Sequence, residues 1–111
     1  MARISEGDGQ LGTLGILVNT DRHLKHVQGL TRAALARGHP VIIFVMDEGT
    51  RLLQNAGLAG LAALEGVTLS LCSHSAERHG VKTDALPGAM VCGSQLNNAM
   101  MNHQAERVVV F

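Results

Sequence analysis

Five short apolar runs, separated by longer mixed segments, constrain the fold of this chain more than any other feature of its sequence. The runs span residues 14–18, 41–46, 67–72, 90–92 and 108–111. Short continuous runs rich in Val, Ile and Leu are typical of strands buried on both faces of a parallel sheet. Because the segments between them have helical periodicity, we expect an α/β three-layer sandwich with about five mostly parallel strands and helices on both faces.

The first helix is predicted from apolar residues that recur at helical spacing between residues 24 and 35. Asp21 precedes this pattern and has a side chain suited to capping a helix N-terminus. Gly38 follows it and is expected to end the helix, because glycine readily adopts the left-handed conformation found after helix C-termini.

Three further helical segments follow, at residues 52–64, 73–80 and 96–101. Two glycines, Gly57 and Gly60, lie inside the first of these. Glycine costs about 1 kcal/mol relative to alanine inside a helix. We therefore expect the two glycines to divide that region into two short helices.

The length of 111 residues corresponds to one domain with its own core. Residues 1–10 contain Gly7, Gly9 and mixed charges, which predicts a flexible leader. The α/β domain is then expected to span residues 11–111. No repeat, linker or low-complexity tract interrupts it.

Charge and aromatic content argue against several classes of partner. Nine Lys and Arg residues are balanced by nine Asp and Glu residues, and the only aromatic residues of the Phe, Tyr and Trp type are two phenylalanines. A neutral chain without stacking platforms is not expected to bind nucleic acid. No apolar run reaches the length of a membrane span, so no membrane association is expected. Near-zero net charge with 46% hydrophobic residues instead favours self-association.

Cys72 is the main candidate for chemistry because it ends an apolar run and precedes the polar Ser73, His74 and Ser75. This pattern places the thiol where the end of a strand meets the start of a helix, the edge at which open α/β sheets carry their sites. Free N–H groups and the helix dipole stabilise a thiolate there, and the thiolate is the nucleophilic form. The alternative is a small buried side chain with no chemical role.

Residues after Cys72 are candidates for supporting roles. His74 and Arg78 are four residues apart, so on a helix that begins near Ser73 they share a face. Both would add positive charge near the thiol, while Glu77 would partly offset it.

Cys92 closes the predicted fourth strand and is the second thiol of the chain. If that strand runs parallel to the one ending at Cys72, both thiols lie at the same edge of the sheet. Cys92 is then either a resolving or second relay cysteine, or a core residue beside Val91. Two cysteines and no secretory signal favour a reducing cytoplasm.

Two other pairs have weaker cases. His23 and His26 are spaced to share a metal ion on a helix, but no third ligand is evident, so a solvated surface pair is favoured and no metal site is predicted. Asp47 and Glu48 are adjacent and are expected to point apart. They are interpreted as polar loop or helix N-terminal charges, at the rim where Cys72 is expected.

Several segments together resemble the DsrE/TusD family of sulfur-relay proteins. The resemblance is strongest around the cysteine, where a strand delivers the thiol and an Arg, Gly, Val pattern closes the helix behind it. Order and spacing of the segments extend the similarity over nearly the whole chain. The segments that carry it are residues 66–72, followed by Ala76, Arg78, Gly80 and Val81, then residues 44–49 and residues 107–111.

This resemblance implies a flavodoxin-like protomer of the DsrE type that assembles into a dimer, trimer or hexamer. It also implies a sulfur carrier or sulfurtransferase in which Cys72 accepts sulfane sulfur as a persulfide and passes it to a partner such as a TusA-like carrier. No cofactor is expected, because the sulfur is carried covalently. The alternatives are a non-catalytic subunit or binding module of such an oligomer, and a thiol redox protein that uses Cys72 and Cys92.

Overall fold

A computed structural model describes residues 11–111 of the chain, and the leader predicted for residues 1–10 lies outside the described residues. Ten elements follow one another, with strands and helices alternating for most of the length. In chain order they are β1 (Leu14–Val18), α1 (Leu24–Ala36), β2 (Val41–Val45), the 3-10 helix η1 (Asp47–Leu52), α2 (Ala56–Ala62), β3 (Val67–Cys72), α3 (Ser73–Arg78), β4 (Met90–Gly93), α4 (Gln95–Gln104) and β5 (Arg107–Val110).

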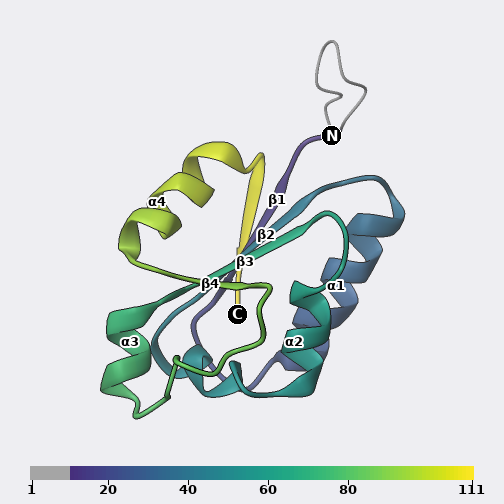
Figure 1. The fold of residues 1–111 in the computed structure, drawn as a ribbon. Coiled ribbons are helices and arrows are strands. Elements are labelled where there is room, and N and C mark those ends of the chain that lie inside the picture. Colours follow the sequence, from purple (N-terminus) through teal and green to yellow (C-terminus); the bar gives the residue numbers. More distant parts are fainter. Residues whose placement is uncertain (1–10) are drawn as a thin grey trace.

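All five strands belong to one parallel sheet, with the order β4-β3-β2-β1-β5. Helices α1 and α2 pack on one face and α4 covers the other, while α3 lies at the end of β3 beside η1 (Figure 1). The predicted fold class is therefore confirmed, with five parallel strands in a single sheet and helices on both faces.

The strand order shows where the chain reverses direction across the sheet. It proceeds from β1 outward to β4 and then returns across the sheet to place β5 on the other side of β1. In flavodoxin the corresponding reversal lies between β1 and β3. The layers of this chain are thus flavodoxin-like, while its reversal lies between β1 and β5.

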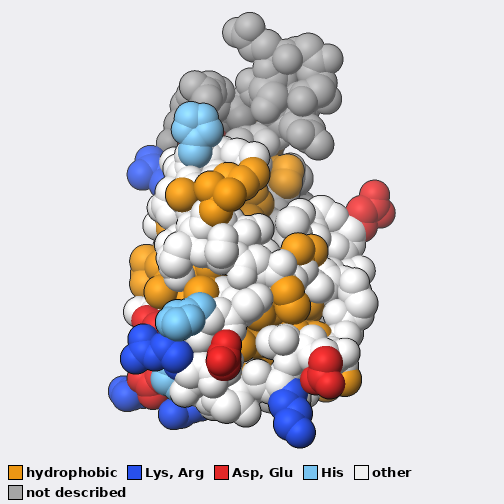
Figure 2. All heavy atoms as spheres, turned by 60° about the vertical axis from the view of Figure 1, so that its left-hand side comes forward, with side chains coloured by type: hydrophobic (Ala, Val, Ile, Leu, Met, Phe, Trp, Pro, Cys, Tyr) orange, Lys and Arg blue, Asp and Glu red, His pale blue; other side chains and the backbone are white. Residues whose placement is uncertain are grey.

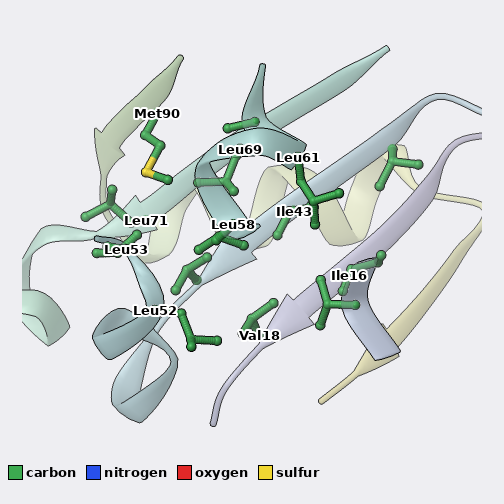
Figure 3. Close-up of a cluster of buried hydrophobic side chains, with 14 of the residues drawn as sticks. Ile16, Val18, Ile43, Leu52, Leu53, Leu58, Leu61, Leu69, Leu71 and Met90 are labelled. Carbon is green, nitrogen blue, oxygen red and sulfur yellow. The ribbon is translucent and has the colours of Figure 1, made fainter. Parts of the chain in front are cut away.

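The larger hydrophobic core fills the space between the sheet and helices α1 and α2. Figure 3 shows side chains from alternate strand positions, such as Ile43 and Leu69, meeting Leu58 and Leu61 of α2. A smaller cluster beneath α4 contains Phe44, Cys72 and Met101. Successive residues of a strand point to opposite faces, so each central strand contributes to both clusters.

The start of α1 differs from the prediction that Asp21 caps it. His23 occupies the N-cap position and makes no side-chain capping hydrogen bond. Asp21 instead lies 3.8 Å from the Arg51 guanidinium. Asp21 is a suitable cap by residue type, but it precedes the first helical residue, Leu24, by too many positions to reach its free N–H groups.

The prediction that Gly57 and Gly60 break the second helical region is wrong, because both lie inside α2. The break comes earlier, between η1 and α2, where the Asn55 side chain accepts a hydrogen bond from Gly57 N–H at 2.7 Å. A Cβ on Gly57 would approach Gln28 Nε2 to 2.6 Å. Tertiary contact with α1 and the Asn55 cap therefore outweigh the low helix propensity of glycine.

Two predicted helix ends are confirmed by backbone conformation. Gly38 has φ +88° after α1, and Gly80 has φ +69° after α3. Residues with a Cβ rarely adopt this left-handed conformation, which turns the chain out of a helix. No helix within residues 11–111 combines the length and the apolar character needed to cross a membrane.

Two glycines give a matched test of the packing. A Cβ on Gly49 would collide with the carbonyl oxygen of Val18 at the end of β1, whereas a Cβ on Gly60 would meet nothing within 4 Å. We expect Gly49→Ala to lower the free energy of unfolding by about 1–3 kcal/mol through overpacking against backbone. Gly60→Ala should raise it by about 0.5–1 kcal/mol, since alanine favours the helix. Urea denaturation of both variants measures this, and equal effects would contradict the close contact between β1 and η1.

Candidate functional site

A hollow of about 720 Å³ opens at the carboxyl ends of β2, β3 and β4. Parallel strands bring these three ends to one edge, and the elements that follow them, η1, α3 and α4, form its walls. The hollow thus lies at the carboxyl edge but away from the β1–β5 reversal. Its lining residues are Met46, Asp47, Cys72, Ser73, His74, Ser75, Arg78, Gly93, Ser94 and Gln95.

Cys72 is the last residue of β3 and the N-cap residue of α3, with φ −85° and ψ 110°. The predicted position at a junction of strand and helix is confirmed. Its side chain belongs to the cluster beneath α4 with Phe44 and Met101, and only 4% of the residue is exposed. The thiol is thus at the boundary between the core and the hollow.

Burial raises the pKa of the Cys72 thiol, because charge is costly away from water. Hydrogen bonds act in the opposite direction: the Ser75 hydroxyl and N–H, the Gln95 side chain and the His74 N–H all favour the thiolate. Together these bonds outweigh burial and hold the pKa below its ordinary value. Two of these donors are backbone N–H groups in the first turn of α3, which have no partner within the helix.

The predicted supporting residues, Ser73, His74 and Arg78, all line the hollow. The shared face predicted for His74 and Arg78 on α3 agrees with this placement. The positive charge expected from His74 and Arg78 is not among the causes that lower the pKa of Cys72. His74 lowers this pKa through its backbone N–H instead. Neutral donors therefore stabilise the thiolate.

Sequence reasoning missed Ser75 and Gln95. Ser75 is buried and occupies the third position of α3, from which a side chain can reach back to the N-cap residue. A serine three positions after the cysteine was therefore a usable sequence signal. Gln95 had no such signal, because only the folding of α4 back over the sheet brings it to Cys72.

Cys92 lies at the same edge of the sheet as Cys72, as predicted from the parallel strands. In the register of β3 and β4, however, Cys72 pairs with Gly93, and Cys92 pairs with Leu71. Neighbours along a strand point to opposite faces, so the two thiols project to opposite sides of the sheet. A disulfide between them would require the backbone to move. Cys92 is exposed, so its interpretation as a core residue is wrong.

The adjacent carboxylates point apart as predicted. Asp47 lines the hollow and has φ +47°, an uncommon conformation that asparagine and aspartate adopt more readily than most residues. Its carbonyl oxygen accepts a hydrogen bond from Thr50 Oγ1 at 2.7 Å. Glu48 instead lies 3.3 Å from Arg51. Asp47 is therefore the only described carboxylate that lines the hollow beside Cys72.

The histidine pair lies among aromatic rings at the surface. The rings of His23 and His26 meet edge to face at a centroid distance of 5.8 Å, and His26 stacks on Phe111. Within residues 11–111 no group of three or more His, Cys, Asp or Glu side chains is arranged to hold a metal ion. The two histidines are exposed, and their observed contacts are with aromatic rings.

A second hollow, of about 360 Å³, lies at the opposite end of the strands. It is formed between the start of β1, the last turns of α1 and the start of β5, and its lining includes Arg37, His39, Glu106 and Arg107. Among the residues that the structure describes, no cysteine or serine lines it. The carboxyl-edge hollow is therefore the better candidate for nucleophilic chemistry.

Comparison with known proteins identifies the type of fold. No protein-family model matches the sequence, and no curated protein matches it either. Among solved structures, the YchN protein from E. coli matches with a TM-score of 0.75 and 14% identity, over 90% of this chain and 99% of that one. MTH1491 from Methanobacterium thermoautotrophicum, described as a protein of unknown function, matches with a TM-score of 0.69 and 16% identity over the same shares. The chain therefore shares the overall fold of YchN and MTH1491.

Alkylation kinetics test the stabilisation of the thiolate. In a Cys92→Ala background, the rate at which iodoacetamide modifies Cys72 should rise with pH and titrate with an apparent pKa below the unperturbed value of about 8.5. Ser75→Ala removes one donor to the thiolate and should raise this pKa by about 1. Ser73→Ala removes an exposed hydroxyl from the same turn and should leave it unchanged. A wild-type pKa at or above 8.5 would support a purely structural cysteine.

Proposed function

We propose that the protein is a sulfur carrier or sulfurtransferase that accepts sulfane sulfur as a persulfide on Cys72 and passes it to a partner protein. The observation that carries this proposal is the placement of Cys72 at an open hollow, with hydrogen bonds that favour its thiolate over its thiol. The similarity of the fold to that of YchN supports the proposal by analogy, because it agrees with the DsrE-type fold expected from the sequence.

The chemistry requires a nucleophilic thiolate and no cofactor. The Cys72 thiolate attacks the outer sulfur of a donor persulfide, so that a new S–S bond forms at Cys72 and the S–S bond of the donor breaks. The donor leaves as a thiolate, and the proton of its persulfide remains on the transferred sulfur. In the second step an acceptor thiolate attacks that outer sulfur and regenerates the Cys72 thiolate. Neither step needs an oxidant or a reductant, because each breaks one S–S bond and forms another.

The geometry around Cys72 is suited to a persulfide. A second sulfur atom on Cys72 would extend toward the hollow, which has room for the thiol of an acceptor. The same neutral donors that favour the thiolate would favour a persulfide anion, because both are sulfur anions that accept hydrogen bonds. Arg78 and Asp47 line the hollow and provide polar contacts for a docking protein.

The position of Cys92 favours sulfur relay over disulfide chemistry. A nearby thiol on the same face would attack the persulfide and release sulfide before an acceptor arrived. The strand register instead directs Cys92 to the opposite face of the sheet. The persulfide on Cys72 is therefore protected from the second thiol of its own chain.

Intact mass spectrometry tests the proposal directly. Incubation with polysulfide, or with thiosulfate and a donor sulfurtransferase, should add mass in units of one sulfur atom. Cys72→Ser should abolish this addition and Cys92→Ser should retain most of it, because Cys72 is the hydrogen-bonded thiol at the hollow. Equal loading of the two variants would overturn the assignment of Cys72.

A second candidate function is supported by the 4% exposure of Cys72. A non-catalytic subunit of a DsrE-type oligomer would retain the fold and bury this cysteine without using it. The two candidates differ in reactivity, since a carrier thiol must be reached by a protein persulfide. Absence of sulfur loading together with slow alkylation would favour the non-catalytic subunit.

We also propose that the protein works as a homo-oligomer, as a trimer or hexamer or else as a dimer. Large apolar side chains are exposed on α4 and on the two edge strands, among them Leu96 at 66%, Met100 at 49% and Val110 at 59% exposure. Figure 2 shows hydrophobic side chains among uncharged ones over the upper and middle parts of one face, with most of the charged groups near its lower edge. Such a surface favours burial against a second protein surface.

Light scattering checks the oligomeric state. The mass in solution at micromolar concentration should exceed that of the 11.7 kDa chain. Leu96→Asp should shift the population toward monomer, because it would place a charge in the buried contact. Gln54→Asp, which adds the same charge at an exposed position outside α4 and the strands, is the matched control. A monomeric wild-type protein would contradict the proposal.

We also propose that the protein acts in the cytoplasm. A carrier thiol must be kept reduced between transfers, and the cytoplasm keeps protein thiols reduced. The donor and the acceptor are expected to be proteins that present a persulfide and a thiol, such as a TusA-like carrier.

A further inference from the structure

The amide side chains of α4 form a chain of hydrogen bonds that neither helix formation nor capping explains. Asn102 Nδ2 donates to Asn98 Oδ1 at 2.9 Å, and Asn98 Nδ2 donates to Gln95 Oε1 at 3.2 Å. Asparagine is a poor helix former. Asn97 is accounted for by the capping box that it makes with Ser94, but Asn98 and Asn102 have no such role.

The direction of this chain fixes the orientation of the Gln95 side chain. An amide has one end that accepts and one that donates hydrogen bonds. Because Asn98 occupies the accepting oxygen of Gln95, the Nε2 group is left to face the hollow, where it donates to Met46 Sδ at 3.6 Å. The same side chain lines the hollow together with Cys72 and lowers the pKa of its thiol.

Close packing brings the first turn of α4 to the end of β3. Gly93 pairs with Cys72 in the sheet, and a Cβ on Gly93 would collide with the Asn97 side chain. At the other end of the helix, Met101 lies against Gly15 of β1. The helix is therefore held at both ends, and Gln95 is presented to the hollow from a rigid element.

We propose that Asn98 and Asn102 are positioning residues that hold the Gln95 amide with its Nε2 group toward the sulfur atoms of Met46 and Cys72. For Cys72 this deepens the proposed function, because the same donor would contact the sulfur anion in both the free and the loaded carrier. Without Asn98, the Gln95 amide would be free to rotate and present its oxygen to that anion, which is repulsive.

Substitution of the amides of α4 leaves the charged and titratable groups that line the hollow around Cys72 unchanged. Asp47 comes from η1, and His74 and Arg78 come from α3. The residues that β4 and α4 contribute to the hollow are Gly93, Ser94 and Gln95, none of which titrates. A change in the apparent pKa of Cys72 on substitution of an α4 amide is then attributable to hydrogen bonding.

A double-mutant cycle on the alkylation profile tests the proposal, in the Cys92→Ala background and with iodoacetamide. Gln95→Ala should raise the apparent pKa of Cys72 by about 0.5. Asn98→Ala should raise it by about half as much and have no further effect when Gln95 is already alanine, because Asn98 acts through Gln95. Gln104→Ala, which removes another amide from α4, should leave the profile unchanged.

Two outcomes would overturn the proposal: an unchanged pKa in Asn98→Ala, or a shift that persists in the Gln95→Ala background. Alanine is a better helix former than asparagine or glutamine, so these variants are expected to fold, and far-UV circular dichroism checks this. Alkylation needs no sulfur donor. The alkylation profile therefore tests the role of the α4 amides separately from sulfur loading, which the mass measurement on Cys72→Ser tests.

Discussion

The parallel pairing of β3 between β2 and β4 is the interaction on which the candidate site depends. Because parallel strands end at one edge, this pairing brings the turns into η1, α3 and α4 together around Cys72. The register then decides which side chains share a face. It places Cys72 opposite Gly93, where the lack of a side chain allows α4 to approach, and it directs Cys92 to the other side of the sheet.

Cys72 illustrates how hydrogen bonds can offset the effect of burial on the pKa of a thiol. Burial alone would make Cys72 a neutral and inert side chain. The opposing hydrogen bonds come from two separate elements, the first turn of α3 with Ser75 and the first turn of α4 with Gln95. Neither element alone surrounds the sulfur. The lowered pKa of the thiol is therefore a property of the layered arrangement of the protein.

Helix α4 has a side that packs on the sheet and an outer surface that carries no Lys, Arg, Asp or Glu. One side packs on the sheet through Met101, which covers Cys72 and Phe44. The outer surface carries amides and exposed apolar side chains with no Lys, Arg, Asp or Glu among residues 95–104. An uncharged outer surface is compatible with the homo-oligomer proposed above, and the amides next to the hollow are compatible with the proposed contact between neutral donors and a sulfur anion.

The sequence by itself determined the strands, the parallel α/β class and the position of Cys72 between strand and helix, because apolar runs and capping glycines act over a few residues. Local propensity misplaced the breaks at Gly57 and Gly60, where contact with α1 and the Asn55 cap prevail. Tertiary structure alone decided the strand order, the faces on which the two thiols lie, and the approach of Gln95 to Cys72. These depend on register and on helix packing between segments far apart in the chain, and no local pattern of residues encodes them.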